Sequence, residues 1–154
     1  MTSDLSAKNQ HIIIVISEFI PQITERLLKG AVDSFLYYNG LKSHLKIFRI
    51  PGAFEIPGTI QQVIHHQKPH AVVALGAVIR GETPHFNFVA GESARGIAEL
   101  SRNADIPIIN GIITTETKNQ AMMRSVPGGR NKGWDAMEAA LKTVSIYREI
   151  QATL

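Results

Sequence analysis

Stretches of consecutive apolar residues alternate along the chain with segments whose apolar positions recur every three or four residues. Four apolar stretches are rich in β-branched side chains and have the length of strands that are covered on both faces. We predict strands at residues 12–16, 45–50, 71–79 and 106–113. The stretch at 71–79 is the most apolar, so we place it at the centre of the sheet.

The segments between these strands have the spacing of amphipathic helices. Pro21 opens the first helix and Asn39-Gly40 closes it. The other helices are predicted in the segment that ends near Lys68-Pro69, from Thr83-Pro84 onward, from Glu116 to about Arg124, and from Asn131 to about Gln151. Because strand and helix alternate throughout, we predict an α/β domain of three layers, with a central four-stranded parallel sheet flanked by helices.

Length and composition fit one domain. The chain has 154 residues, of which 44% are hydrophobic and none is cysteine, which excludes a disulfide scaffold, a cysteine-ligated zinc site and a thiol nucleophile. No apolar stretch reaches the roughly 18 residues of a membrane span. The first ten residues lack the apolar segment of a secretory signal. We therefore expect a cytoplasmic protein without membrane contact, its domain at 11–154 and a separate N-terminal segment at 1–10.

The charge pattern argues against a nucleic-acid partner. The net charge is only +3 and the basic residues are scattered, whereas a nucleic-acid-binding protein gathers them on one face. Only the segment from Lys118 to Lys132 is locally basic. That segment suits one small anion better than a duplex.

In a parallel α/β sheet, ligands bind beyond the carboxyl ends of the strands. At one such end the chain turns at Gly81 and enters a helix, with Thr83 as the expected N-cap and Pro84 in the first turn. Free N–H groups and the helix dipole would make this turn an anion site. It is not a Walker loop, because the Lys-Ser/Thr pair is missing. An ordinary strand-to-helix turn is the competing interpretation.

Four further side chains follow predicted strand ends or the basic segment. His85 lies beside the Gly81 turn and could transfer a proton near neutral pH, although a surface histidine is the simpler interpretation. Phe19 and Phe54 could stack on a flat ring or simply pack in the core. Arg124 could bind a phosphate with two hydrogen bonds, or only complement a helix dipole.

Two other uses of such a fold do not match the sequence. A flavodoxin has a Ser/Thr-rich phosphate loop after the first strand, where this chain has Ser17-Glu-Phe-Ile-Pro21. A receiver domain needs an acceptor aspartate after the central strand, where this chain has Gly76-Ala77. Both functions are disfavoured.

Taken together, these segments resemble the lumazine synthase family of riboflavin biosynthesis. The resemblance covers residues 12 to 150, in the family's order and spacing. The matching stretches are PGAFEIP at 51–57, ALGAVIRGETPH at 74–85, GIITTE at 111–116, NQA at 119–121 and NKG at 131–133.

The resemblance implies a flavodoxin-like subunit in a ring of five, with active sites shared between adjacent subunits. The implied reaction is that of a transferase that joins 5-amino-6-(D-ribitylamino)uracil to 3,4-dihydroxy-2-butanone 4-phosphate. Imine formation, phosphate elimination and ring closure then give 6,7-dimethyl-8-ribityllumazine without a metal or organic cofactor. In this family the N-terminal segment can add a strand to a neighbour's sheet.

The resemblance also assigns roles to individual residues. Phe19 stacks on the pyrimidine, Glu55 accepts hydrogen bonds from the ribityl chain, and His85 transfers protons. The residues implied at the pyrimidine and ribityl end are Phe19, Ala53, Phe54, Glu55, Ala77, Val78, Ile79, Asn110 and Lys132. Those implied at the phosphate are Gly81, Glu82, Thr83 and Arg124, the last from the adjacent subunit.

Two departures from the family pattern change these expectations. Asn110 stands where many members carry an aromatic residue, which makes the neighbour's wall of the site more polar. The loop Pro127–Asn131 differs from the loop of members that build sixty-subunit capsids, which favours a pentamer or a decamer.

Two non-enzymatic functions compete with the synthase: a non-catalytic flavin or lumazine binder on the same fold, and an assembly protein with a vestigial pocket. The combination of Gly81, His85 and Arg124 favours the enzyme over both.

Overall fold

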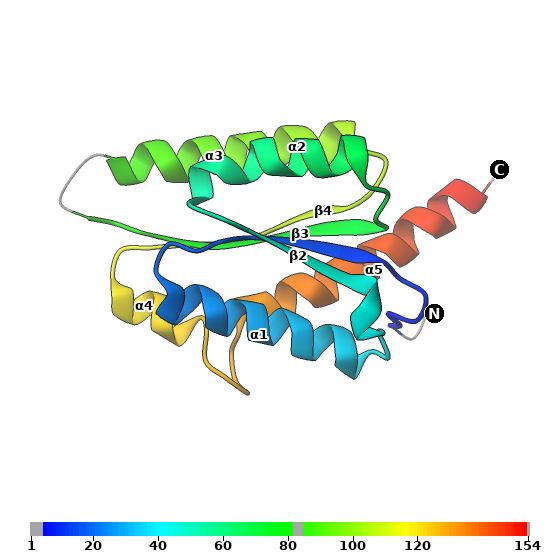
Figure 1. Ribbon diagram of the computed structural model, residues 1–154, viewed down its shortest axis with the longest axis horizontal. Helices are drawn as coiled ribbons and strands as arrows, with labels where there is room; N and C mark the ends of the chain where they lie inside the picture. The colour runs from blue at the N-terminus through cyan, green and yellow to red at the C-terminus, as the bar shows by residue number, and fades with distance from the viewer. Residues whose placement is uncertain (1–4, 82–84, 154) are drawn as a thin grey trace.

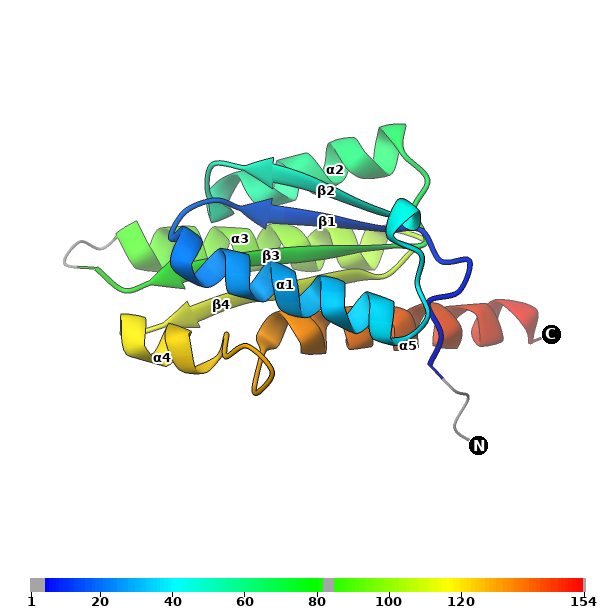
Figure 2. The same cartoon turned by 60° about the horizontal axis from the view of Figure 1, so that its bottom comes forward.

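Four parallel strands form a single sheet in the computed structural model, which describes residues 5–81 and 85–153. Their spatial order is β2-β1-β3-β4, so β1 and β3 lie in the middle, and Figure 2 shows the four strands side by side. The predicted central position of 71–79 is confirmed. The strands are β1 (Ile12–Ser17), β2 (Leu45–Ile50), β3 (Ala71–Ile79) and β4 (Ile108–Thr115).

Helices cover both faces of the sheet, which confirms the predicted three-layer α/β fold (Figure 1). One face carries α1 (Pro21–Tyr37), α4 (Lys118–Met123) and α5 (Lys132–Ala152). The other face carries α2 (Ile56–His66) and α3 (His85–Asn103). Two short 3-10 helices, η1 (Lys42–His44) and η2 (Ala53–Glu55), flank β2.

The alternation of side chains along the middle strands divides the core into two parts. Ile12, Ile14 and Ile16 of β1 belong to the cluster formed with α1 and α5. Ile13 and Val15 belong to the cluster formed with α2 and α3. Every residue of β1 is buried, which explains why its sequence is apolar from Ile12 to Ile16.

The fourth strand lies two residues later than predicted, at Ile108–Thr115 instead of 106–113. Pro107 has no N–H to donate to a ladder, although its oxygen accepts a bond from Val72 N at 3.0 Å. The polar residue Thr115 extends the strand because it pairs with Ile79. A prediction from apolar character alone therefore places this strand two residues too early.

The ends of α1 and the start of α5 agree with the predicted signals, whereas α4 begins at Lys118, two residues later than the predicted Glu116. Gly40 N donates to Phe35 O at 2.9 Å beyond the end of α1. Thr117 caps α4 in a capping box, and Asn131 Oδ1 caps α5 by accepting a bond from Trp134 N at 3.0 Å. The predicted N-cap Thr83 and Pro84 lie outside the described residues.

The helices α1 and α5 touch through glycines. A Cβ on Gly133, near the start of α5, would overlap the main-chain oxygen of Leu27 on α1. A Cβ on Gly30 would overlap the side chain of Asn131. Both glycines are buried, so this close approach depends on their having no side chain.

Before β1, the described part of the N-terminal segment packs on its own chain. Ala7 is fully buried, and its N–H donates to Tyr38 O at 2.7 Å. The pairing of this segment with a neighbour's sheet stays a prediction. Within the described residues, every helix is too short or too polar to cross a membrane.

Candidate active site

The connections that follow β1 and β3 leave the sheet at the carboxyl ends of these two neighbouring strands. The helix α1 follows β1 on one face of the sheet, and α3 follows β3 on the other face (Figure 1). The connections therefore diverge at these two neighbouring strands. This is the position where open α/β sheets bind ligands.

Phe19 lies at this edge of the sheet, shortly after β1. Its ring is 65% exposed, so it does not pack in the core. The next residue, Ile20, has φ 60 and ψ 68, the left-handed conformation that β-branched residues rarely adopt. Ile20 O accepts bonds from the N–H groups of Ile23 and Thr24 at the start of α1. This strained turn sets the direction of the chain beside Phe19, and no pattern in the sequence predicts it.

A second aromatic group lies at the same edge of the sheet. Phe54 of η2 is 49% exposed, and its ring stacks on that of Phe88 at 5.6 Å with an interplanar angle of 17°. Phe88, in the first turn of α3, is 56% exposed and was not predicted as a site residue. Nearby, Ala53 is buried and Glu55 is exposed. The exposed rings provide flat apolar surface for a heterocycle.

The last residues of β3 have main-chain groups that extend beyond the pairing with β1. Pairing of β3 with β1 ends at Leu75 in the described register, whereas pairing with β4 continues to Ile79. The main-chain N–H and C=O groups of residues 77–79 on the side of β1 lie beyond the described pairing with that strand. They are therefore available for hydrogen bonds to a ligand. Ala77 and Val78 bury their side chains and Ile79 is half-buried, so only their main chains suit this role.

Gly81 and His85 flank the turn from β3 to α3. Both residues are exposed, and His85 is the first residue of α3. The two remaining residues of the predicted phosphate site, Glu82 and Thr83, lie outside the described residues.

Arg80, at the start of this turn, contacts the end of β4 and the residue that follows it. Its Nε lies 2.6 Å from Glu116 Oε2, and its guanidinium carbon lies 4.8 Å from the centre of the Phe86 ring. Its main-chain N–H donates to Thr115 O at 2.9 Å. Neither Arg80 nor Glu116 was predicted as a site residue, because their proximity follows from the register of β3 with β4.

The predicted basic residues Arg124 and Lys132 lie together, but across the sheet from His85. Lys132 N donates to Arg124 O at 2.8 Å, and Arg124 Nη1 lies 3.4 Å from Thr114 O. Arg124 follows α4, which lies on the opposite face from α3 although both helices start at the same end of the sheet (Figure 1). One chain therefore does not bring Arg124 onto the face that carries His85.

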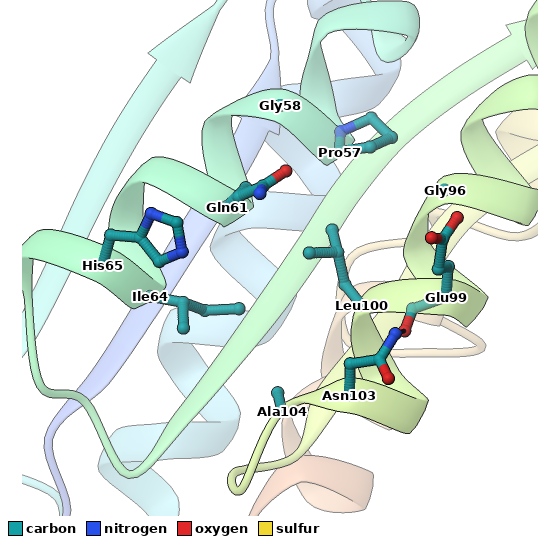
Figure 3. Close-up of a pocket in the computed structure, with 10 residues that line it drawn as sticks. All are labelled: Pro57, Gly58, Gln61, Ile64, His65, Gly96, Glu99, Leu100, Asn103 and Ala104. Carbon is teal, nitrogen blue, oxygen red and sulfur yellow. Dashed lines mark hydrogen bonds between the residues drawn. The ribbon is translucent and has the colours of Figure 1, made fainter.

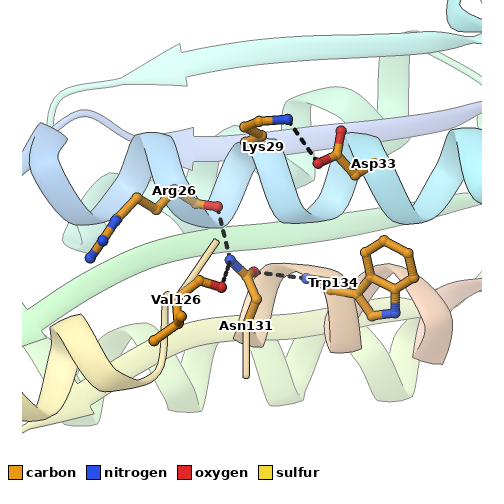
Figure 4. Close-up of polar contacts among 6 residues, drawn as sticks. All are labelled: Arg26, Lys29, Asp33, Val126, Asn131 and Trp134. Carbon is orange, nitrogen blue, oxygen red and sulfur yellow. Dashed lines mark hydrogen bonds and ion pairs between the residues drawn. The ribbon is translucent and has the colours of Figure 1, made fainter. Parts of the chain in front are cut away.

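The loop that bears these basic residues is fixed by Asn131, which is only 4% exposed (Figure 4). Asn131 Nδ2 donates to Arg26 O at 3.1 Å and to Val126 O at 3.5 Å. Its Oδ1 accepts the bond from Trp134 N. The side chain thus joins α1, the loop and α5.

Asn110 lies apart from the other predicted residues. It is in the middle of β4, not at the strand end, since the strand runs on to Thr115. Its side chain is exposed, and Asn110 Oδ1 accepts a bond from Ile112 N at 3.0 Å. It lines a hollow of about 360 Å³ between α3 and the outer strand β4, together with Ser93 and Thr114.

Another hollow, between α2 and α3, contains none of the predicted site residues (Figure 3). It measures about 330 Å³, and its lining includes Pro57, His65 and Leu100. In the described part of the chain, no group of three or more histidine or acidic side chains is arranged to hold a metal ion.

A histidine cluster lies at the amino edge of the sheet, opposite the carboxyl edge that carries Phe19 and His85. The rings of His11 and His44 stack at 4.0 Å, and His11 N donates to His70 Nδ1 at 2.9 Å. Burial, then the charge of Arg148 and the neighbouring His11, lower the pKa of His70 below its ordinary value of 6.5. This cluster is remote from the predicted site.

Comparison with known proteins gives one consistent family. A family model described as 6,7-dimethyl-8-ribityllumazine synthase matches residues 9–148. Proteins of that name are similar to this chain: one from Nautilia profundicola is 41% identical over 92% of each chain. One from Chloroherpeton thalassium is 40% identical over 96% of this chain and 95% of its own. One from Campylobacter jejuni subsp. doylei is 40% identical over 92% of each chain.

Among solved structures, a de novo designed Rossmann fold protein aligns with a TM-score of 0.42 and 14% identity over 73% of this chain and 91% of its own.

Proposed function

The chain belongs to the 6,7-dimethyl-8-ribityllumazine synthase family, and on that premise we propose that the active site lies at the carboxyl edge of its sheet. The protein is a transferase of riboflavin biosynthesis. It condenses 5-amino-6-(D-ribitylamino)uracil with 3,4-dihydroxy-2-butanone 4-phosphate to give 6,7-dimethyl-8-ribityllumazine and phosphate. The observation that carries the site assignment is the convergence of Phe19, Phe54 and the Gly81–His85 turn on one edge of the sheet.

The pyrimidine ring stacks on Phe19, and the main chain of residues 77–79 forms hydrogen bonds with the polar edge of the ring. This assignment is supported by the 65% exposure of Phe19 and by the end of the β1–β3 pairing at Leu75. The ribityl chain extends toward residues 53–55, where Glu55 is exposed and able to accept hydroxyl hydrogen bonds. Phe88 extends the apolar wall through its stack on Phe54.

The phosphate binds at the Gly81 turn, and His85 transfers protons during imine formation and phosphate elimination. An imidazole titrates near neutral pH and can therefore act both as an acid and as a base. Holding two small reactive substrates together in the right orientation accelerates their reaction strongly, because orientation alone can lower the barrier by roughly 7–11 kcal/mol.

Arg124, Lys132 and Asn110 act in the site of an adjacent subunit in a ring of five, which can pair as a decamer. Supporting this, Arg124 and His85 belong to opposite faces of one chain's sheet, so a second copy is needed to unite them (Figure 1). A head-to-tail contact between copies generates such a closed ring. We place the enzyme in the cytoplasm, because a phosphate dianion does not cross a lipid bilayer unaided.

Turnover is tested by mixing both substrates and following lumazine fluorescence and released phosphate. Binding of riboflavin without product formation would instead identify a non-catalytic binder. Sedimentation velocity of the wild-type protein tests the ring of five, and a monomer of full activity would exclude shared sites.

Subunit complementation tests the sharing directly. His85→Ala and Arg124→Ala chains are purified separately, unfolded, mixed in equal amounts and refolded together. Each shared site draws its two residues from different chains, so about one quarter of the sites should regain both. The control is the same treatment of each variant alone. No recovery above the separate variants would mean that His85 and Arg124 act within one chain.

Arg124→Ala should also raise the KM for the phosphate ester about 10- to 100-fold, as expected for a lost hydrogen bond to a charged group. Arg102→Ala, near the far end of α3, is the matched control for lost charge. An unchanged KM in Arg124→Ala would remove this residue from the phosphate site.

A further inference from the structure

The described residues that precede β1 are held to the rest of the chain at three points. Ala7 is fully buried in the cluster formed with α1 and α5, and its N–H donates to Tyr38 O at 2.7 Å. Gln10 is 7% exposed, and its Oε1 accepts a bond from Arg148 Nη2 of α5 at 3.2 Å (Figure 2). The third point is His11, which directly precedes β1. These residues therefore pack on their own chain although they belong to no helix or strand.

His70 binds both main-chain groups of His11. The main-chain N–H of His70 donates to His11 O at 2.7 Å, and His70 Nδ1 accepts a bond from the N–H of His11 at 2.9 Å. A ring nitrogen accepts a hydrogen bond only when it carries no proton, so this contact requires neutral His70 with its proton on Nε2. Protonation of Nδ1 would turn the acceptor into a donor and place two N–H groups against each other. The bond to the N–H of His11 therefore exists in only one charge state of His70.

Basic groups from several elements surround this corner of the sheet. They are Arg148 of α5, His11 itself, His44 of η1, Lys46 of β2 and Lys68 in the loop before β3. A hollow of about 150 Å³ lies beside the two stacked histidines, and its lining includes no carboxylate from the described chain. Asp105, in the loop before β4, lines a different hollow with Tyr147 of α5. A positive charge on His70 is therefore repelled by its neighbours.

The fold favours the neutral state of His70 near neutral pH. Burial, the charge of Arg148 and the neighbouring His11, in this order, lower the pKa of His70 below 6.5. The stack of His11 on His44, with 4.0 Å between the ring centres, becomes repulsive once both rings are charged. Acidification therefore removes a bond to His11 and at the same time adds positive charge next to it.

These changes act on a part of the fold that is held by few contacts. Within the described chain, residues 5–11 take part in no strand pairing, whereas β1 pairs with β2 on one side and with β3 on the other. Segments with few hydrogen bonds and little buried surface open at a lower free energy than strands in the middle of a sheet. Loss of the bond to His70 should thus free this segment before the sheet opens.

We propose that His70 is an acid-sensitive switch for residues 5–11. In its neutral state it holds them on their own chain, and its protonation releases them while the sheet and its helices stay folded. The switch lies at the amino edge of the sheet and does not depend on the proposed function. Its operation uncovers the surface that Ala7 occupies at the end of α1.

Hydrogen exchange of the full-length protein, followed by mass spectrometry of its peptides, tests the switch. Peptides that cover residues 5–11 are compared with peptides from β1 in a series from about pH 7.5 to about pH 4.5, which spans the titration of histidine. Each rate is divided by the intrinsic exchange rate at that pH. Protection of residues 5–11 should fall about tenfold along the series, as expected for one lost hydrogen bond and added repulsion. Protection of β1 should stay within about twofold.

Two substitutions of His70 separate the bond from its titration. Asparagine keeps an acceptor for the N–H of His11 but cannot titrate, so His70→Asn should protect residues 5–11 equally well throughout the series. Alanine lacks the acceptor, so in His70→Ala these residues should exchange about tenfold faster than in the wild type already at neutral pH. His66→Asn, an exposed histidine near the end of α2, is the matched control and should follow the wild type.

Three results would overturn the proposal. In the first, protection of residues 5–11 in the wild type does not change with pH. In the second, His70→Asn loses protection at acid pH as the wild type does, which would assign the effect to His11 or His44. In the third, β1 loses protection together with residues 5–11, which would mean that the whole domain unfolds. Should His70→Ala fail to fold, the wild type and His70→Asn still decide between these results.

Discussion

The side-chain amide of Asn131, on the loop before α5, donates a hydrogen bond to the main-chain oxygen of Arg26 on α1, 3.1 Å away. The same side chain caps α5 through Trp134 N. It fits between the helices only because Gly30 has no side chain there. One buried amide thus fixes the loop that carries Arg124 and Lys132.

Asn131→Ala should lower the free energy of unfolding by about 1–3 kcal/mol, because it removes the cap of α5 and the hydrogen bond that links the loop to Arg26 O of α1. Urea denaturation measures this loss. Asn103→Ala is the control, since exposed Asn103 only donates to Glu99 O within α3. It should change stability by less than about 0.5 kcal/mol. Equal losses in both variants would show that the links of Asn131 to α1 and α5 contribute little.

The left-handed conformation of Ile20 predicts an unusual order of two substitutions. Ile20→Gly should be about 1 kcal/mol more stable than Ile20→Ala, because only glycine adopts this conformation without a Cβ penalty. Thermal or urea unfolding gives the order. At Ile146, within α5, alanine should be the more stable of the two, as in ordinary helices. The same order at both positions would argue against the strained turn beside Phe19.

His85→Ala should lower kcat about a hundredfold and leave both KM values within about twofold, because proton transfer is lost while binding remains. The residual rate reflects the substrates being held together. Stopped-flow measurement of lumazine formation gives kcat. His66→Ala, exposed near the end of α2, is the control and should behave as the wild type. A wild-type kcat in His85→Ala would exclude this histidine from the chemistry.

The lowered pKa of His70 makes stability depend on pH. Since the folded pKa lies below 6.5, the unfolded chain takes up the proton first as the pH falls. The free energy of unfolding should therefore decrease as the pH falls through 6.5, and the decrease should end once the pH is below the folded pKa.

Denaturation of His70→Asn across this pH range checks that assignment. Asparagine keeps an acceptor for the N–H of His11 but cannot titrate, so the variant should lose this part of the pH dependence. His66→Asn is the control and should keep it. An unchanged pH dependence in His70→Asn would assign the effect to other groups.

Much of the fold could be predicted from the sequence because each apolar stretch carries its own signal. The bounds of β2 and β3 match the predicted 45–50 and 71–79. The bounds of β4 do not, since its end depends on pairing with β3 and its threonines carry no apolar signal.

The candidate site could be predicted only in part from the sequence. Phe19 and His85 follow or precede recognisable turns, whereas Phe88 and Arg80 gain their importance from contacts with Phe54 and Glu116. Those contacts join residues more than thirty positions apart. The packing of two helices and the register of two strands decide them, and neither is encoded in any local stretch.

Gly133 has a consequence for anyone who wishes to modify this protein. Hydrogen is the largest substituent that fits between its α-carbon and the carbonyl of Leu27. Random mutagenesis at this codon followed by selection for growth should therefore return glycine alone. Labels, tags and crosslinkers are better introduced on the outer surface of α5, for example at Lys142, which faces solvent.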